Sequence, residues 1–432
     1  MSIFDNGLEG EYYVHNWGWM VRALKDNIEK TGDLETAWNE FRQEYIDLIP
    51  PLVIQQIDKA IADGVFTAKI QEIIDNFPVL SIKDFGAVGD GKHDDTEAFL
   101  SAINENDIVL FPEGIYIINA PTFGETEENR VFHKKLIGVN PLTTQIIVHS
   151  NYLFFSQCGD ITLKNIQFST DNPTLITTPV GFWKHHGLCI DNCIFNGGKS
   201  FALQCANTDD VRITNSKFQG SKENSALNFS TDANLMHGEF SQKPIYIENC
   251  EFTNGGLDGV IANNDNFTFV NCYAYENGTH NHAAGYYSNN MRNHRYISCR
   301  SEHNTGNGFD FVSVKNFVVD SCVAYDNDSA GIFAGQSEFI RIVNSYATEN
   351  GNQPVEEAQD SGIAIKQVSN ASIINNSLFD RRVNPFQTFG IRMSTGCQNI
   401  YTGLNTTAPN KSGSIYSKSA YNAIKTDAVP AD

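Results

Sequence analysis

The pattern of apolar and polar positions divides the chain near residue 79. Over residues 12–77, apolar side chains recur at steps of three and four residues, and this period predicts helices. Residues 53–77 approach a heptad spacing, which is typical of helices that pack on other helices. The apolar stripe is too narrow for a core of its own. We therefore favour a self-associating stalk for residues 1–78 over a small independent helical bundle.

From residue 80 onward, the helical period gives way to short segments in which apolar and polar residues alternate. Nine of these segments end in an Asn or Ser turn, at Asn165, Asn192, Asn215, Asn249, Asn271, Ser298, Ser321, Asn344 and Asn375. Half of the steps between these turn residues are 22 or 23 residues long, and the longer steps contain insertions. A recurring step of this length is one coil of a parallel β-helix, in which each strand pairs with its counterpart one coil away.

Two further columns follow the same coil. A second set of strands begins at Gly259, Gly285, Gly308, Gly331, Gly362 and Gly390, where glycine suits a sharp corner between sheets. Cysteines recur directly after the turn residue at Cys193, Cys250, Cys272, Cys299 and Cys322, with Ser216 and Ser345 in the same place. We expect the cysteines to form an internal stack of reduced thiols and the Asn column to form a hydrogen-bond ladder.

Composition narrows the classes of function. The 432-residue chain has a formal net charge of −21, which opposes binding to nucleic acids and to anionic membrane surfaces. No stretch has the length and apolarity of a membrane span, and the N-terminus lacks the blocks of a signal peptide, so we expect a soluble protein. Nine cysteines without paired CxxC spacing argue against a disulfide framework and against a zinc site.

Residues 80–100 read LSIKDFGAVGDGKHDDTEAFL. Asp94, Asp95 or Thr96 can cap a short helix whose apolar face, from Phe99 to Ile103, would close the open end of the first coil. Together with the strand predicted over residues 109–116, this segment closely resembles the opening motif of the pectate-lyase-like superfamily of right-handed β-helices. That superfamily includes many bacteriophage tail spikes and tail appendages. The family motif is structural, so no catalytic role follows for its acids.

The resemblance implies an all-β right-handed parallel β-helix over residues 79–405, preceded by the helical segment 1–78 and followed by a polar cap or tail, 406–432. It further implies a homotrimeric virion tail protein, made in the host cytoplasm, whose N-terminal helices attach to other tail proteins. Its target would be a host cell-surface glycopolymer, namely capsule, exopolysaccharide or wall teichoic acid. The N-terminal helices are similar in style to leading segments of tail proteins of phages of Gram-positive hosts, which favours teichoic acid.

The coil register suggests a site for such a polymer. Enzymes that cleave sugars need carboxyl groups for proton transfer or nucleophilic attack, and aromatic faces for sugar rings. Two outward columns carry an acid between two aromatic residues, with Tyr287, Asp310 and Phe333 in one and Tyr275, Glu302 and Tyr325 in the other. In the adjoining turn, the same register places His303 between Glu276 and Asp326.

We predict that Asp310 and Glu302 form a catalytic carboxylate pair and that His303 shares or tunes the proton transfer. The expected substrate-binding residues are Tyr275, Tyr287, Tyr325, Phe333, Arg300 and Lys366. Outward aromatic and acidic residues also form ladders that only stabilise a sheet, so this structural interpretation stays open.

Three other interpretations stay open as well. A lyase would use a cation near an acidic sugar, which Lys366, Arg392, Arg300, Arg292 or Arg295 could supply, but we favour hydrolysis. A receptor-binding protein without catalysis, or a purely structural spike component, would have the same fold. No cofactor is predicted, because the Ca²⁺ site of pectate lyases has no matching positions here. The histidines His280, His282 and His294 are expected to form a polar loop face rather than a metal site.

Overall fold

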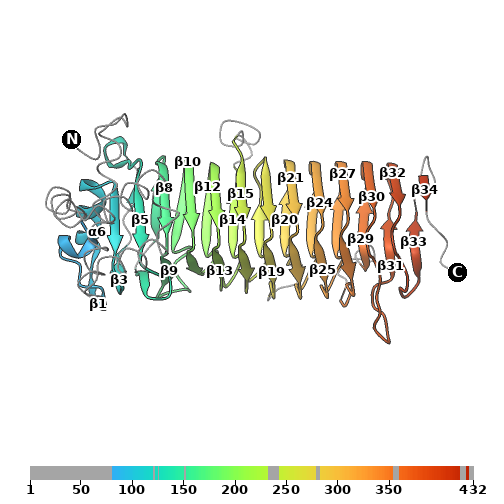
Figure 1. Cartoon of the computed structure of the whole chain (residues 1–432), viewed down its shortest axis with the longest axis horizontal. Helices are drawn as coiled ribbons and strands as arrows, with labels where there is room; N and C mark the ends of the chain where they lie inside the picture. The colour runs from blue at the N-terminus through green and yellow to red at the C-terminus, as the bar shows by residue number, and fades with distance from the viewer. Residues whose placement is uncertain are drawn as a thin grey trace, which may run out of the picture.

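A computed structural model describes residues 80–119, 122–124, 126–149, 152–231, 243–278, 283–353, 360–418 and 425–427, the last three by their backbone alone. The predicted helical segment 1–78 lies outside these residues. The described chain is a parallel β-helix of stacked coils (Figure 1), as the repeat predicted. No helix in the described ranges is long and apolar enough to cross a membrane.

Each complete coil contributes strands to three parallel sheets. The first is an 11-stranded sheet of β1 (Asp90–Asp94), β3 (Gly114–Ile118), β6 (Thr144–Val148), β9 (Gln167–Thr170), β11 (Ile194–Asn196), β13 (Lys217–Gln219), β16 (Glu251–Thr253), β19 (Tyr273–Tyr275), β22 (Arg300–Glu302), β25 (Val323–Tyr325) and β28 (Tyr346–Thr348).

The other two sheets are joined where β10 and β12 run through both. The second sheet contains β4 (Thr122–Phe123), β7 (Leu153–Ser156), the first parts of β10 (Val180–Asp191) and β12 (Leu203–Thr214), β14 (Leu227–Ser230), β17 (Val260–Ala262), β20 (Tyr286–Asn289), β23 (Phe309–Val312), β26 (Ile332–Gly335), β29 (Ser361–Lys366), β31 (Phe389–Met393) and β33 (Gly413–Ser417). The third sheet contains β2 (Ile108–Phe111), β5 (Lys135–Gly138), β8 (Gly159–Lys164), the second parts of β10 and β12, β15 (Ile245–Glu248), β18 (Phe267–Val270), β21 (Arg292–Ile297), β24 (Lys315–Asp320), β27 (Glu338–Val343), β30 (Ser369–Ile374), β32 (Gln398–Gly403) and β34 (Lys425–Asp427).

The corner between the third sheet and the 11-stranded sheet is formed by the predicted turn residues. All nine have a positive φ, between 48° and 56°, a left-handed conformation that Asn tolerates better than most residues. Their side chains bond between coils, as when Asn192 Nδ2 donates to Asn165 Oδ1 at 2.9 Å and Asn271 Nδ2 donates to Asn249 Oδ1 at 2.8 Å. The prediction of an Asn ladder is confirmed.

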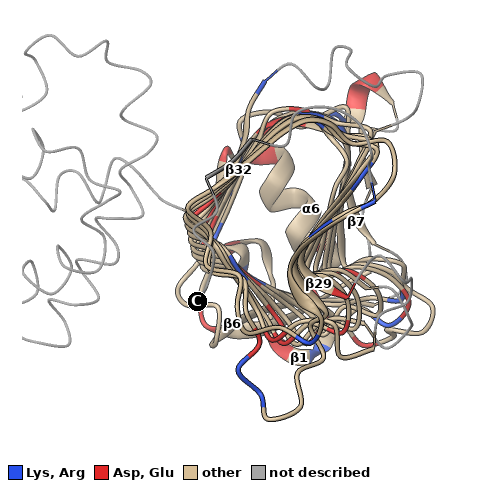
Figure 2. Ribbon diagram, turned by 90° about the vertical axis from the view of Figure 1, so that its right-hand side faces the viewer, with Lys and Arg blue, Asp and Glu red and all other residues tan. Residues whose placement is uncertain are grey.

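The space inside the coils is filled by apolar side chains. Seen end-on, the strands surround this core on three sides, and helix α6 (Thr96–Glu105) lies at the N-terminal end (Figure 2). Phe99 and Ile103 of α6 are fully buried, so the helix closes the first coil as predicted. The carboxylate of Asp94 accepts the Thr96 N–H at 3.0 Å, and short 3-10 helices lie at Ile82–Phe85 and Glu127–Asn129.

Two details of the prediction were wrong. The strand expected over residues 109–116 is two strands, β2 and β3, because the chain turns between different sheets at Pro112 and Glu113. The backbone conformation at a corner does not require glycine in the glycine column, since none of the six glycines has a positive φ. A Cβ on Gly308 would lie 2.5 Å from the Gly331 carbonyl oxygen and 2.9 Å from Asn327 Nδ2, so the packed neighbouring coils leave no room for a side chain.

The cysteine column is confirmed. All nine cysteines are free, and the five in the column are buried together with Ser216 and Ser345. The serines bond within the stack, as when the Cys193 N–H donates to Ser216 Oγ at 3.1 Å. Burial raises the pKa of the Cys193 thiol to about 12, so this thiol stays protonated at neutral pH.

Candidate functional site

The outward column of the second sheet brings an acid between two aromatic residues, as the register predicted. Asp310 in β23 pairs with Tyr287 in β20 on one side and with Phe333 in β26 on the other. Asn307 Nδ2 donates to Asp310 Oδ2 at 2.8 Å and so orients the carboxylate. Phe333 is only 7% exposed because it packs against Ala330 and Ala364, which leaves little of its ring for a ligand.

A second acid, Asp258, interacts electrostatically with Asp310 from outside this column and was missed from the sequence. It lies in the turn just before β17, and its Oδ1 accepts the Ala284 N–H at 2.7 Å. Burial raises the pKa of Asp258 to about 7, and the nearby Asp310 carboxylate adds to the rise. Burial, Asp310 and Asp258 likewise raise the pKa of Tyr287. We call Asp258, Tyr287 and Asp310 the carboxylate cluster.

The sequence held one signal for Asp258. It directly precedes the first glycine of the glycine column, at Gly259. In the following coils this position is occupied by uncharged residues, namely Ala284, Asn307, Ala330, Ser361 and Phe389. A single acid in an otherwise uncharged column of a coil corner is unusual, because a buried carboxylate is costly to ionise.

Glu302 belongs to a different set of contacts on the 11-stranded sheet. Its register between Tyr275 and Tyr325 is as predicted, yet its hydrogen-bond partner is Tyr273, whose hydroxyl donates to Oε2 at 2.7 Å. Arg300 Nε donates to the other carboxylate oxygen, and the whole residue is 4% exposed. Glu302 therefore already has a cation and a hydroxyl as partners, whereas Asp310 lies beside Asp258. The catalytic pairing of Glu302 with Asp310 stays a prediction.

His303 occupies the turn after β22, in the predicted column with Glu276 and Asp326, and all three residues have a positive φ. Its Nδ1 lies 3.1 Å from Asp326 Oδ2, and its ring meets the Tyr325 ring edge-on at a centroid distance of 5.9 Å. Both side chains of the His303–Asp326 pair are partly exposed. The pair lies on the outer surface of the coil, where its catalytic role stays untested.

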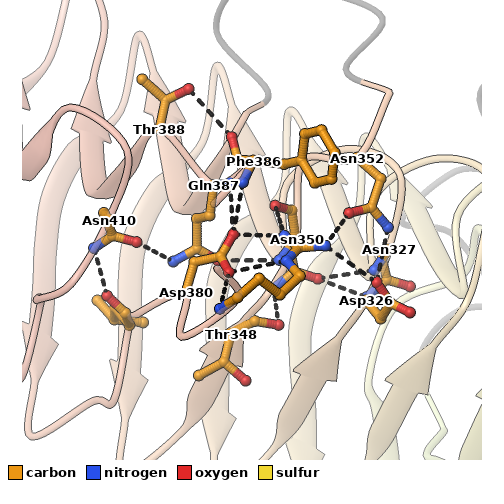
Figure 3. A network of polar contacts seen from close by, with 12 residues as sticks. Asp326, Asn327, Thr348, Asn350, Asn352, Asp380, Phe386, Gln387, Thr388 and Asn410 are labelled. Atoms are coloured by element: carbon orange, nitrogen blue, oxygen red, sulfur yellow. Dashed lines mark hydrogen bonds and ion pairs between the residues drawn. The ribbon is translucent and has the colours of Figure 1, made fainter. Parts of the chain in front are cut away.

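Asp326 also belongs to a polar network that anchors the loop between β30 and β31 (Figure 3). The Asn352 amide donates to Asp326 Oδ1 at 2.8 Å, and Arg382 Nη1 lies 3.4 Å from the same oxygen. Arg382 Nη2 donates to Asp380 Oδ2 at 2.6 Å, and Asp380 also accepts the Gln387 N–H. The Asp380 carboxylate has so many donors that its pKa is lowered despite burial.

The remaining predicted cations differ in their surroundings. Lys366 ends β29 beside Gly335 and is partly buried. Arg392, four coils from Tyr287 in the same outward column, pairs with Asp360 at 2.8 Å and lies 5.3 Å from the ring centroid of Tyr416. Arg300 lies over the Tyr273 ring at 5.5 Å.

The histidine prediction was wrong for His294. Its side chain is fully buried because β21 turns it into the core, where Nε2 lies 2.6 Å from the Asn264 carbonyl oxygen and Nδ1 lies 3.2 Å from Ser288 Oγ. Burial lowers the pKa of His294 to about 4. His280 and His282 lie outside the described residues. Within the described ranges, no group of three or more His, Cys, Asp or Glu side chains is arranged to hold a metal ion.

Comparisons with known proteins agree with this fold. Residues 202–378 match the family model for a right handed beta helix region. The pre-neck appendage protein of Bacillus phage B103 is 24% identical over 276 residues, which are 60% of this chain and 30% of that protein. The plasmin and fibronectin-binding protein A of Streptococcus pneumoniae is 28% identical over 36% of this chain and 23% of its own length. The chain thus spans less than a third of the length of either relative.

Solved structures show the same fold at low sequence identity. The Dettilon tailspike protein superposes with a TM-score of 0.55 at 13% identity, over 80% of this chain and 69% of that one. The A-module of a mannuronan C-5 epimerase from Azotobacter vinelandii gives a TM-score of 0.55 at 14% identity, over 80% and 100%. These comparisons confirm the right-handed β-helix fold that the sequence predicted, and the pre-neck appendage protein is one of the proteins to which the chain is similar.

Proposed function

We propose that this chain is part of a virion tail and binds a host cell-surface glycopolymer. It cleaves this polymer by carboxylate-assisted hydrolysis at the second sheet. The carboxylate cluster is the observation that carries the proposal. It combines an acid that keeps its proton to about pH 7, Asp258, with a second acid, Asp310, and an outward tyrosine between them. Two carboxyl groups in unlike environments are what glycoside hydrolysis requires.

Each residue of the cluster has a separate task in this mechanism. Protonated Asp258 donates its proton to the leaving-group oxygen, and ionised Asp310 activates the attacking water. Tyr287 offers its ring to a sugar. Asp258 and Asp310 belong to coils that are two steps apart, and Asp258 lies three residues before Ile261, which is the register counterpart of Asp310. With neighbouring strands spaced by about 4.8 Å, the two acids belong to separate positions of the same face rather than to one contact pair.

Turnover of purified host glycopolymer tests the mechanism. Loss of a positioned acid or base typically costs 10²–10⁴-fold in rate, so Asp258→Asn and Asp310→Asn should each lower kcat by at least about 100-fold and leave binding intact. Glu338→Gln removes a partly exposed, ion-paired acid of the third sheet and should leave turnover unchanged. Product size by mass spectrometry is the readout. Unchanged turnover in both Asp variants would rule out the carboxylate cluster as the catalytic site.

The pH profile tests the assignment of Asp258 as the acid. Because this carboxyl must be protonated to donate, kcat/KM should fall as pH rises through about 7. New ultraviolet absorbance from unsaturated uronic acids in the products would instead indicate a lyase, and attention would move to Lys366 and Arg392.

A non-catalytic receptor-binding protein is the second candidate function. It is favoured by the paired state of the outward residues on the 11-stranded sheet, where Arg300, Tyr273 and Glu302 bond to one another. Such a prearranged polar surface suits recognition. Binding of the polymer without any shortening of its chains would support this candidate.

A further inference from the structure

A pocket of about 410 Å³ lies away from the carboxylate cluster, toward the N-terminal end of the β-helix. Its walls come from Phe132, from the junction of β7 and β8, from the bend inside β10, and from Lys243, two residues before β15. Three of its eight lining residues, Lys184, His186 and Lys243, are basic, and one, Asp160, is acidic. The whole chain has a formal net charge of −21, so this pocket is richer in basic residues than the chain as a whole.

A buried carboxylate organises the basic side of this pocket. Asp209 is fully buried, and its Oδ1 contacts His186 Nδ1. Its Oδ2 accepts the backbone N–H of Lys243 at 3.2 Å. Asp209 therefore holds the imidazole and the Lys243 backbone in place from beneath the pocket wall, and Lys243 Nζ bonds to Asp210 at 3.0 Å. Because two of the three basic side chains are held in position, less conformational freedom is lost when a ligand binds.

Lys184 completes the basic side from the bend in β10. Its φ is 49°, and its Nζ lies 4.4 Å from the ring centroid of Trp183, a cation–π contact that steadies the ammonium group. Phe132 also lines the pocket, is 48% exposed and offers an apolar face. Asp160, which pairs with His133 at 3.0 Å, can accept hydroxyl hydrogens. The pocket thus combines three basic side chains, two of them paired with the carboxylates of Asp209 and Asp210, with a hydroxyl acceptor and an apolar surface.

We propose that this pocket binds an anionic sugar or polyol unit of the glycopolymer. Lys184, His186 and Lys243 hold the phosphate or carboxylate group, and the carbon skeleton packs on Phe132. The identity of the polymer rests on the proposed function. Binding in the pocket does not require cleavage, because it uses none of the carboxylate cluster.

Calorimetric titration with glycerol 3-phosphate, with glucuronate and with inorganic phosphate tests the proposal on the full chain. Lys184→Asn suits the bend, since the equivalent residue one coil later is Asn207 with a φ of 51°. Lys184→Asn and Lys243→Gln should each weaken binding of the organic anion at least ten-fold. Lys315→Gln, which removes a lysine paired with Glu338 elsewhere on the third sheet, should leave the affinity unchanged.

The outcomes separate this proposal from the catalytic one. Asp258→Asn should bind the probe as the parent does while losing turnover, and the better of the two organic anions identifies the polymer's charged group. Affinity equal to the parent's in both pocket variants would overturn the proposal, as would binding of inorganic phosphate alone or of no probe. Unfolding midpoints like that of the parent exclude misfolding as the cause of any loss.

Discussion

At the scale of single residues, Asp258 is expected to lower stability at neutral pH. Its pKa is about 7 in the folded chain and about 3.9 when unfolded, so the unfolded state releases the proton first. Stability therefore falls as pH rises from about 4 to 7, by up to about 4 kcal/mol. Asp258→Asn keeps a carbonyl for the Ala284 N–H and stays neutral. It should raise the thermal midpoint at pH 8 but not at pH 4, as followed by circular dichroism.

The control for Asp258 is an acid with an ordinary environment. Glu338→Gln alters a partly exposed ion pair with Lys315 and should shift the midpoint little at either pH. Equal midpoints of Asp258→Asn and the parent at pH 8 would mean that the carboxyl is solvated, and the assignment of Asp258 as a proton donor would lose its basis.

At the scale of elements, a buried amide ladder holds the corner before the second sheet. Asn277 Nδ2 donates to Asn304 Oδ1, and Asn304 Nδ2 donates to Asn327 Oδ1, each at 2.9 Å. Asn304→Ala removes the acceptor of the Asn277 backbone N–H and of one Asn277 amide bond, while the amide keeps its bond to the Phe252 carbonyl oxygen. Since each buried unsatisfied group costs about 1–3 kcal/mol, we expect a loss of about 3 kcal/mol in urea unfolding.

The solvent-exposed Asn ladder of the turn residues provides a control for this loss of stability. Asn271→Gly keeps a residue that accepts the φ of 50° and removes only solvent-accessible amide bonds, so the expected cost is below about 1 kcal/mol. If both substitutions lowered the free energy of unfolding by the same amount, burial would not explain a difference in stability between the two ladders.

At the scale of the whole molecule, we expect association through the N-terminal helices. Helix α6 already closes the end of the β-helix, so the apolar stripe predicted over residues 12–77 is left to pair with other copies. Light scattering of the full chain should give a mass near three times 48.0 kDa. A mass of 48.0 kDa itself would contradict the predicted trimer.

The coil of this β-helix can be read from the sequence alone. Strand alternation, the turn column, the cysteine stack and the pairing of Asp310 with Tyr287 all follow from patterns that repeat about every 23 residues. In a solenoid each coil contacts mainly its neighbours, so a local repeat is enough to set the register.

The contacts between polar side chains of different coils became clear only from the tertiary structure. Asp258 lies in a corner, outside the alternating strands, and its approach to Asp310 depends on how that corner folds. Likewise, Tyr273 reaches Glu302, and His294 turns into the core. The basic pocket joins Phe132, Lys184 and Lys243, which lie on different coils. Corners and insertions follow no fixed period, so their side-chain contacts depend on packing and charge rather than on spacing in the sequence.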